Sequence, residues 1–297
     1  MFDIEVNNVT KKYGDRIVVD DVSFTVSGHE ILGIIGPNGA GKTTNIRMVM
    51  DVIKPDSGSV LVFGKKFDDD LKDRIGYLPE ERGLYRKSHI IDSMVYLATL
   101  KGMSVEKARQ RSEELLARVG FQNYRNRKIE ELSHGMAQIV QILVAIVHDP
   151  QIIILDEPFN GLDPVNVKMV KEMILELKTQ GKAIMLSTHR MNEVEELCNR
   201  IFMISKGKNV LYGDIDEIKA RYKSDSILLD YEGDIGKIEG IEIKPVKNHT
   251  VEIHPHGKLT HQQLLEILIA RKVMINKFEV STPSLNDIFI QVAGAKQ

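Results

Sequence analysis

The sequence has little cysteine, no long apolar run and almost no net charge. Its one cysteine, Cys198, cannot form a disulfide within the chain, which fits a protein of the reducing cytosol. The most apolar stretch, residues 139–155, is interrupted by polar side chains and Pro150, whereas a membrane-spanning helix needs about 20 mostly apolar residues. We therefore expect nothing in the chain to cross a bilayer. The first residues, MFDIEVNN, also show no signal peptide.

The charge balance argues against a strongly basic protein that binds nucleic acid. The 40 Lys and Arg residues are offset by 42 Asp and Glu residues, which leaves a net charge of −2. Hydrophobic residues make up 42% and charged residues 28%, as in ordinary soluble proteins. A length of 297 residues predicts two domains. We expect two folded domains and no nucleic-acid partner.

A glycine-rich loop gives the first indication of chemistry. Residues 36–43, GPNGAGKT, fit the pattern G-x-x-x-x-G-K-[ST], between a predicted buried strand (30–35) and a predicted helix (43–53). Glycines let successive backbone N–H groups face one anion, and the start of the helix adds partial positive charge. Lys42 can reach the β- and γ-phosphates of a nucleotide, and Thr43 can bind Mg²⁺. The candidate phosphate-binding residues are Gly36, Pro37, Asn38, Gly39, Ala40, Gly41, Lys42, Thr43 and Thr44.

Two carboxylates follow a second buried strand. Residues 151–156, QIIILD, form the continuous β-branched run of a parallel strand that is covered on both faces. Asp156 and Glu157 then lie where ligands bind, at the carboxyl end of such strands. Asp156 can hold the metal, and Glu157 can orient or deprotonate the attacking water. The alternative is a pair of solvated loop residues.

A third motif gives the chain a family resemblance. Residues 132–138, LSHGMAQ, resemble the LSGGQ signature of the nucleotide-binding subunits of ATP-binding-cassette (ABC) transporters. Ser133, Gly135 and Gln138 match this signature, whereas His134 and Met136 depart from it. The loop at 36–43, the signature and the later ILDEP occur in the family's order, and the resemblance covers about residues 3–213. Ser133 also begins a predicted helix, so it can form a second anion site or simply cap that helix.

The resemblance implies roles for further residues. Tyr13 lies where the family stacks an aromatic ring on adenine, although it could instead pack at a turn. Asp163, in NGLD, matches the loop that links the two nucleotide sites, and His189 matches the switch histidine at the γ-phosphate. In the family each nucleotide lies between the Lys42 loop of one chain and the Ser133 helix of another. ATP is thus the expected ligand and Mg²⁺ its metal.

Glu80 departs from the family pattern, which usually has glutamine after Gly76-Tyr77-Leu78-Pro79. An unpaired carboxylate near a phosphate would be repelled by it, at a cost of about 3 kcal/mol for 5.5 Å and an effective dielectric near 20. We therefore expect Glu80 to contact the metal. The string EERGLY that it opens resembles a subgroup that exports sodium, drugs or peptide-like compounds.

The fold class predicted is α/β. It combines a P-loop ATPase cassette over residues 1–213 with a small α/β domain over 214–297. The cassette is expected to contain a mostly parallel sheet, an antiparallel β part and a helical insert near 88–148. The tail resembles a domain appended to the export subgroup, with SLNDIF at 284–289 as its nearest match. Its last helix presents an apolar face, which core packing explains better than docking.

The resemblance implies an ATP-hydrolysing subunit that powers transport through a separate membrane-spanning permease. Export is favoured over import. The expected partners are the permease and a second nucleotide-binding subunit, identical or a paralogue, and the expected location is cytoplasmic, on the inner face of the cell membrane. Two alternatives remain: a soluble cassette that acts on ribosomes or DNA, and a regulatory module that binds ATP without hydrolysis. Glu157 and His189 argue against the second.

Overall fold

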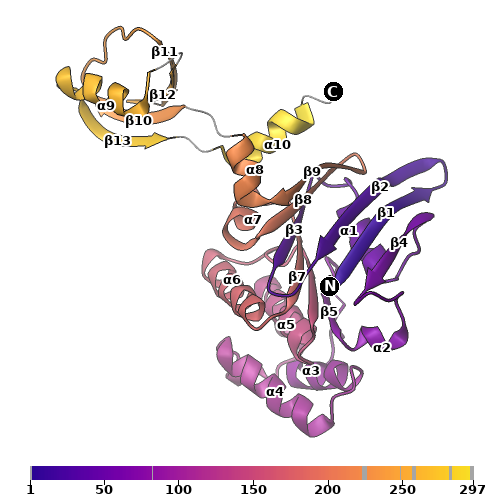
Figure 1. The fold of residues 1–297 in the computed structure, drawn as a ribbon. Helices are drawn as coiled ribbons and strands as arrows, with labels where there is room; N and C mark the ends of the chain where they lie inside the picture. The colour runs from indigo at the N-terminus through magenta and orange to yellow at the C-terminus, as the bar shows by residue number, and fades with distance from the viewer. Residues whose placement is uncertain are drawn as a thin grey trace. The chain divides into compact units, whose positions relative to one another are not determined.

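The computed structural model describes residues 2–81, 83–222, 226–247, 249–255, 259–280 and 283–294. The chain divides into two compact units, Met1–Ile215 and Asp216–Gln297, each considered separately below. The first unit contains two sheets and the helices around them (Figure 1).

The main sheet of the first unit has the strand order β5-β6-β7-β3-β8-β9. Five strands are parallel and β9 is antiparallel to β8. Residues of β3 and β6 are buried throughout, as expected for strands that are covered on both faces. The strands are β3 (Ile31–Ile35), β5 (Ile75–Leu78), β6 (Ile152–Asp156), β7 (Ala183–Thr188), β8 (Arg200–Ser205) and β9 (Lys208–Asp214).

A three-stranded antiparallel sheet, with the order β2-β1-β4, lies beside the main sheet. Its strands are β1 (Ile4–Tyr13), β2 (Arg16–Val26) and β4 (Ser57–Val62). The inward side chains of this sheet join those of β3, β8 and helix α1 (Lys42–Val49) in one hydrophobic core. The start of α1 is thereby fixed between the two sheets.

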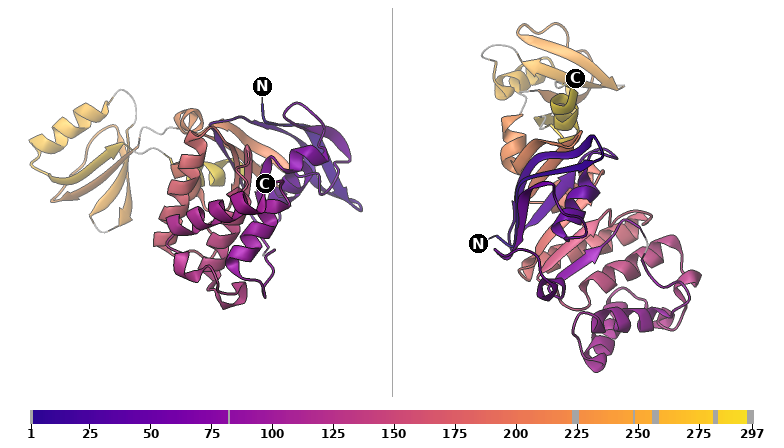
Figure 2. Two further views of the ribbon diagram at one scale, coloured as in Figure 1. Left: turned by 90° about the horizontal axis from the view of Figure 1, so that it is seen from below. Right: turned by 90° about the vertical axis from the view of Figure 1, so that its right-hand side faces the viewer.

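Helices cover the opposite face of the main sheet and extend beyond it (Figure 2). Helix α5 (His134–Ile146) packs against β5 and β6, and α3 and α4 pack on α5 and on each other. The others in this unit are α2 (Asp69–Lys72), α3 (Ile90–Thr99), α4 (Val105–Arg118), α6 (Pro164–Thr179) and α7 (Met191–Leu197), with 3₁₀ turns at Gln122–Tyr124 and Ile129–Glu131. The helical insert predicted near 88–148 thus contains α3 to α5.

The second unit combines an antiparallel sheet, ordered β11-β12-β10-β13, with three helices. Leu264 and Leu268 of α9 are fully buried against the apolar face of this sheet, which gives the unit a core of its own. Its elements are α8 (Ile215–Arg221), β10 (Ile227–Glu232), β11 (Ile241–Lys247), β12 (Thr250–Pro255), α9 (His261–Ala270), β13 (Met274–Val280) and α10 (Leu285–Gly294).

Three details differ from the sequence-based expectations. The first part of the predicted helical insert is not one continuous helix, because Gly102, with a φ of 81°, separates α3 from α4. Helix α1 ends at Val49 instead of near residue 53. The strand β11 was not predicted. In the described residues, no helix has the length and apolar character needed to span a membrane.

Candidate nucleotide site

The glycine-rich loop lies between β3 and α1 and is pressed against neighbouring backbone. A Cβ on Gly36 would lie 2.2 Å from the carbonyl oxygen of Ile204, which no real side chain tolerates. Gly41, the residue before α1, has a φ of 112°, and a Cβ there would lie 2.9 Å from the carbonyl oxygen of Val18. Only glycine fits these two positions, so the loop curls tightly around the amino terminus of α1.

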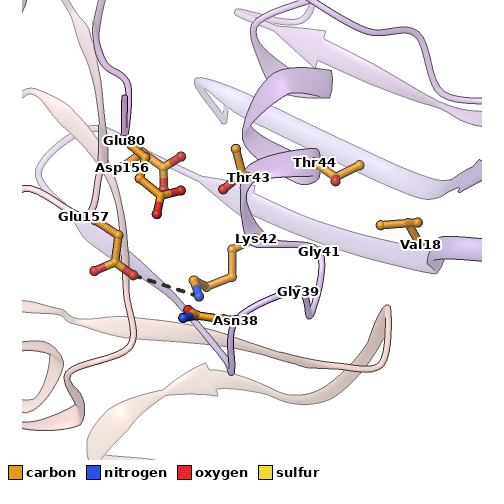
Figure 3. A pocket seen from close by; sticks show the side chains of 10 residues that line it. All are labelled: Val18, Asn38, Gly39, Gly41, Lys42, Thr43, Thr44, Glu80, Asp156 and Glu157. Carbon is orange, nitrogen blue, oxygen red and sulfur yellow. Dashed lines mark ion pairs between the residues drawn. The ribbon is translucent and has the colours of Figure 1, made fainter. Parts of the chain in front are cut away.

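A cavity of about 360 Å³ opens over this loop (Figure 3). Figure 3 shows Lys42 and Thr43 on one side of it and three carboxylates on the other. The lining residues are Val18, Asn38, Gly39, Gly41, Lys42, Thr43, Thr44, Glu80, Asp156 and Glu157. Residues predicted from three separate segments therefore meet in one place. Val18 is an addition, since nothing in its sequence context marks it.

The Lys42 ammonium group is buried among oxygen atoms. Its Nζ donates to the carbonyl oxygen of Gly36 at 2.9 Å and lies 3.9 Å from Oε1 of Glu157. The side chain is only 7% exposed. A phosphate that enters the loop can replace these oxygens as the partner of Lys42.

Asp156, at the end of β6, is buried with one oxygen partnered and one unpartnered. Oδ1 accepts a hydrogen bond from the Ser187 hydroxyl, whereas Oδ2 makes none within the described part of the chain. Burial raises the pKa of Asp156, the Ser187 hydroxyl opposes that rise, and the negative charges of Glu80 and Glu157 add to it. A cation beside Asp156 would relieve both the lost solvation and the repulsion.

The residues around Oδ2 of Asp156 fit a hard divalent cation. Thr43 and Glu80 line the same cavity and offer the oxygen ligands that Mg²⁺ prefers. Within the described residues, no three His, Cys, Asp or Glu side chains are grouped so that they could hold a metal alone. A Mg²⁺ ion at this place would need further oxygen ligands, which Thr43, water and the phosphates of a nucleotide can offer.

Glu157 is held in an unusual conformation at the edge of the cavity. Its φ is 51°, in the left-handed region that non-glycine residues seldom adopt. Its backbone N–H donates to the carbonyl oxygen of Ser187 at 3.0 Å. Nδ1 of His189 lies 2.9 and 3.0 Å from its two carboxylate oxygens. The carboxylate thus lies between His189 and Lys42 on the wall of the cavity.

Ser133 and Gly135 are not among the residues that line this cavity. Ser133 caps α5, where its Oγ accepts from the N–H of Met136 at 3.2 Å, and its side chain is exposed. The next residue, His134, begins the helix. The residues of the predicted second anion site are therefore not part of the cavity over the glycine-rich loop.

The other predicted residues do not line the cavity. Tyr13 ends β1 and is 50% exposed. Asp163 caps α6 by accepting from the N–H groups of Val165 and Asn166, both at 3.0 Å, and the Asn166 N–H is the main reason why the pKa of Asp163 is low. Gln138 is buried in α5 and is not among the residues that line the cavity. Ser187, which contacts both Asp156 and Glu157, was missed, although it directly precedes the Thr188-His189 pair of the motif.

Known proteins share both parts of this chain. Residues 19–160 match the family model "ABC transporter", and residues 213–293 match "ATP-binding protein DrrA1-3-like, C-terminal domain". YhaQ, an ABC transporter ATP-binding protein of Bacillus subtilis strain 168, is 39% identical over 98% of this chain and 99% of its own length. The linearmycin resistance ATP-binding protein LnrL of the same organism is 28% identical, covering 98% of each chain. The solved structure of cbiO1 from Clostridium perfringens, part of the ABC transporter complex cbiONQ, is 26% identical, with a TM-score of 0.66 over 74% of this chain and 92% of its own.

Proposed function

Because the chain belongs to the family of ABC transporter ATP-binding subunits, we propose a specific way in which it binds and uses ATP. As a member of this family it is an ATP hydrolase that powers transport. The proposal concerns the roles of its residues, the need for Mg²⁺, the second cassette and the direction of transport. It rests most directly on the position of Glu157 between His189 and Lys42.

Within one chain, the glycine-rich loop binds the triphosphate and the carboxylates direct its hydrolysis. Lys42 exchanges its contact with the Gly36 carbonyl oxygen for the β- and γ-phosphates. Thr43, Glu80 and Asp156 would hold Mg²⁺, which when bound would neutralise phosphate charge. Glu157 directs water onto the γ-phosphate, and His189 fixes the carboxylate and contacts the phosphate.

A complete site requires a second copy of the cassette. Ser133 and the amino-terminal end of α5 form an anion site, and Ser133 does not line the cavity of its own chain. The γ-phosphate on one chain thus binds the Ser133 helix of the other, while Tyr13 stacks on the adenine and Asp163 links the two sites. Hydrolysis removes the shared charge, so the two copies separate.

The movement of the two copies drives a membrane-spanning permease. Its contact surface includes Glu80–Tyr85 and the helical insert, which follow the site directly in the chain. Export is favoured because the tail matches the DrrA1-3-like C-terminal domain and a full-length relative is named for linearmycin resistance. The chain then works on the cytoplasmic face of the membrane, attached through the permease.

Replacement of the catalytic carboxylate tests this proposal. Glu157→Gln keeps the size of the side chain but cannot accept a proton from water, so we expect turnover to fall at least 100-fold, within the range of general-base contributions. ATP binding should persist, and dimers should accumulate with Mg²⁺-ATP. Phosphate release and size-exclusion chromatography measure the two effects.

A matched control is Glu172→Gln on the exposed surface of α6, where the same chemical change should leave turnover and oligomeric state unchanged. Turnover of wild-type magnitude in the Glu157→Gln protein, or a monomer in saturating Mg²⁺-ATP, would contradict the proposal.

A further inference from the structure

The side chain of Gln138 faces the backbone that follows Glu157 in the same chain. Gln138 lies on α5, and only 5% of its surface is exposed. Its Nε2 donates to the carbonyl oxygen of Pro158 at 3.2 Å and, more weakly, to that of Glu157 at 3.5 Å. In this arrangement the amide nitrogen is bonded to its own chain, and Gln138 is not among the residues that line the cavity.

These bonds act on a strained part of the backbone. Glu157 adopts its left-handed conformation only because its surroundings hold it there, and such conformations persist where neighbouring groups fix them. On one side, the Glu157 N–H is bonded to the carbonyl oxygen of Ser187 on β7. On the other side, Gln138 binds the carbonyl groups of residues 157 and 158. The backbone on both sides of the Glu157 Cα is therefore hydrogen-bonded, to Ser187 of β7 on one side and to Gln138 of α5 on the other.

The start of α5 is also closely packed on the next part of this segment. A Cβ on Gly161, whose φ is 74°, would lie 2.2 Å from Nδ1 of His134. A Cβ on Gly135 would lie 3.1 Å from the carbonyl oxygen of Gly161. The first turns of α5 and residues 157–161 therefore pack without a gap, and a shift of one requires a shift of the other.

We propose that Gln138 is a positioning residue for Glu157 of its own chain, and not a ligand of the nucleotide shared with the partner chain. The donor amide keeps the 157–158 backbone in the conformation that presents the carboxylate between His189 and Lys42. The inference rests on the proposed function, since it needs Glu157 as the group that directs water.

Dimers made of two different variant chains can show whether Gln138 affects Glu157 of its own chain or the site that it shares with the partner chain. One chain, carrying one affinity tag, has Glu157→Gln, so the only working site uses Glu157 of the second chain and Ser133 of the first. Gln138→Met, which keeps the length of the side chain but removes its donor, is then placed on either the first or the second chain. The two dimers contain the same substitutions and so control for each other.

The proposal predicts that turnover falls about tenfold when Gln138→Met is on the chain with the intact Glu157. It predicts little change when it is on the other chain, and an unchanged Michaelis constant for ATP in both. The proposal would be overturned if turnover fell only when Gln138→Met is on the chain that carries Glu157→Gln. A weaker affinity for ATP in place of slower turnover would also overturn it. Thermal melting of each purified dimer verifies that both arrangements are equally folded.

If neither mixed dimer hydrolyses ATP, or if no dimer forms, the two-chain site of the proposed function is contradicted instead. The role of Gln138 is then tested by measuring turnover and ATP binding of a protein in which Gln138→Met is the only substitution. Slower turnover with unchanged ATP binding still supports a positioning role, and weaker ATP binding at unchanged turnover overturns it.

Discussion

At the scale of single residues, the site depends on buried carboxylates whose charges are compensated in different ways. Glu157 has His189 and Lys42 beside it. Among the described residues, Oδ1 of Asp156 has the Ser187 hydroxyl as its partner and Oδ2 has none. Burial and the charge of Glu80 raise the pKa of Asp156, whereas the hydroxyl groups of Ser187 and Thr43 lower it. The negative charge around Asp156 is therefore only partly balanced by the protein. A bound divalent cation would stabilise this corner of the cavity more than any other part.

Glu80 offers a direct test of that charge balance. Glu80→Gln removes one negative charge from the Mg²⁺ side of the cavity, so the metal should bind less tightly. We expect the Mg²⁺ concentration for half-maximal ATP hydrolysis to rise about tenfold, which corresponds to about 1.4 kcal/mol of lost attraction. Titration of turnover with Mg²⁺ at saturating ATP measures this, and an unchanged titration curve would exclude a metal contact by Glu80.

His148, which does not line the nucleotide cavity, makes the stability of the folded state depend on pH. Its Nε2 lies 3.2 Å from the carbonyl oxygen of Ile75, and its buried Nδ1 has no partner among the residues that the structure describes. Burial lowers the pKa of His148 to about 4. The folded state therefore binds this proton less readily than the unfolded state, where the pKa is near 6.5. Stability due to neutral His148 is complete above pH 6.5 and is lost as the pH falls towards 4.

We expect His148→Gln to reduce this pH dependence. Between pH 7 and pH 4.5, the free energy of unfolding of the wild-type protein should fall by about 2–3 kcal/mol more than that of the variant. Denaturant unfolding at the two pH values measures the difference. Equal losses in the two proteins would show that His148 does not titrate on unfolding.

At the scale of elements, helix α5 combines capping with a predicted anion site. Ser133→Ala should destabilise the protein by about 1 kcal/mol, because the N–H of Met136 loses its acceptor. Ser133→Asp should preserve this cap, since Asp is an equally good one, but it places a carboxylate where the partner's γ-phosphate is expected to bind. ATP hydrolysis should then be lost in both variants, with stability lost only in the first.

Melting temperatures and phosphate release separate the two roles of Ser133. Full hydrolysis by the Ser133→Asp protein would mean that Ser133 is a cap alone.

The elements that could be predicted are those whose signals are local. The buried strand before the glycine loop and the start of α5 at Ser133 are confirmed. The strand β11 was missed because Pro245 lies within it. Proline is tolerated there because β11 pairs only with β12 among the described strands, so that it is an edge strand.

At the scale of the whole molecule, the motifs predicted which segments form the site but not all of their contacts. The order of the glycine loop, the signature and ILDEP indicated that Lys42, Asp156 and Glu157 meet, and they line one cavity. The roles of Ser187 and of the buried Gln138 depend on how β7 and α5 pack beside Glu157. Contacts between residues so far apart in the sequence have no local signal.

The central claim is that each ATP lies between Lys42 of one chain and Ser133 of another, and mixing two inactive variants tests it most directly. Neither Lys42→Ala nor Ser133→Ala chains alone can form a complete site. A mixed dimer combines Lys42 of the Ser133→Ala chain with Ser133 of the Lys42→Ala chain. We predict that mixing the two proteins restores ATP hydrolysis, to about a quarter of the wild-type rate if subunits pair at random and each site works independently. Turnover in the mixture no greater than the average of the two separate proteins would contradict the account.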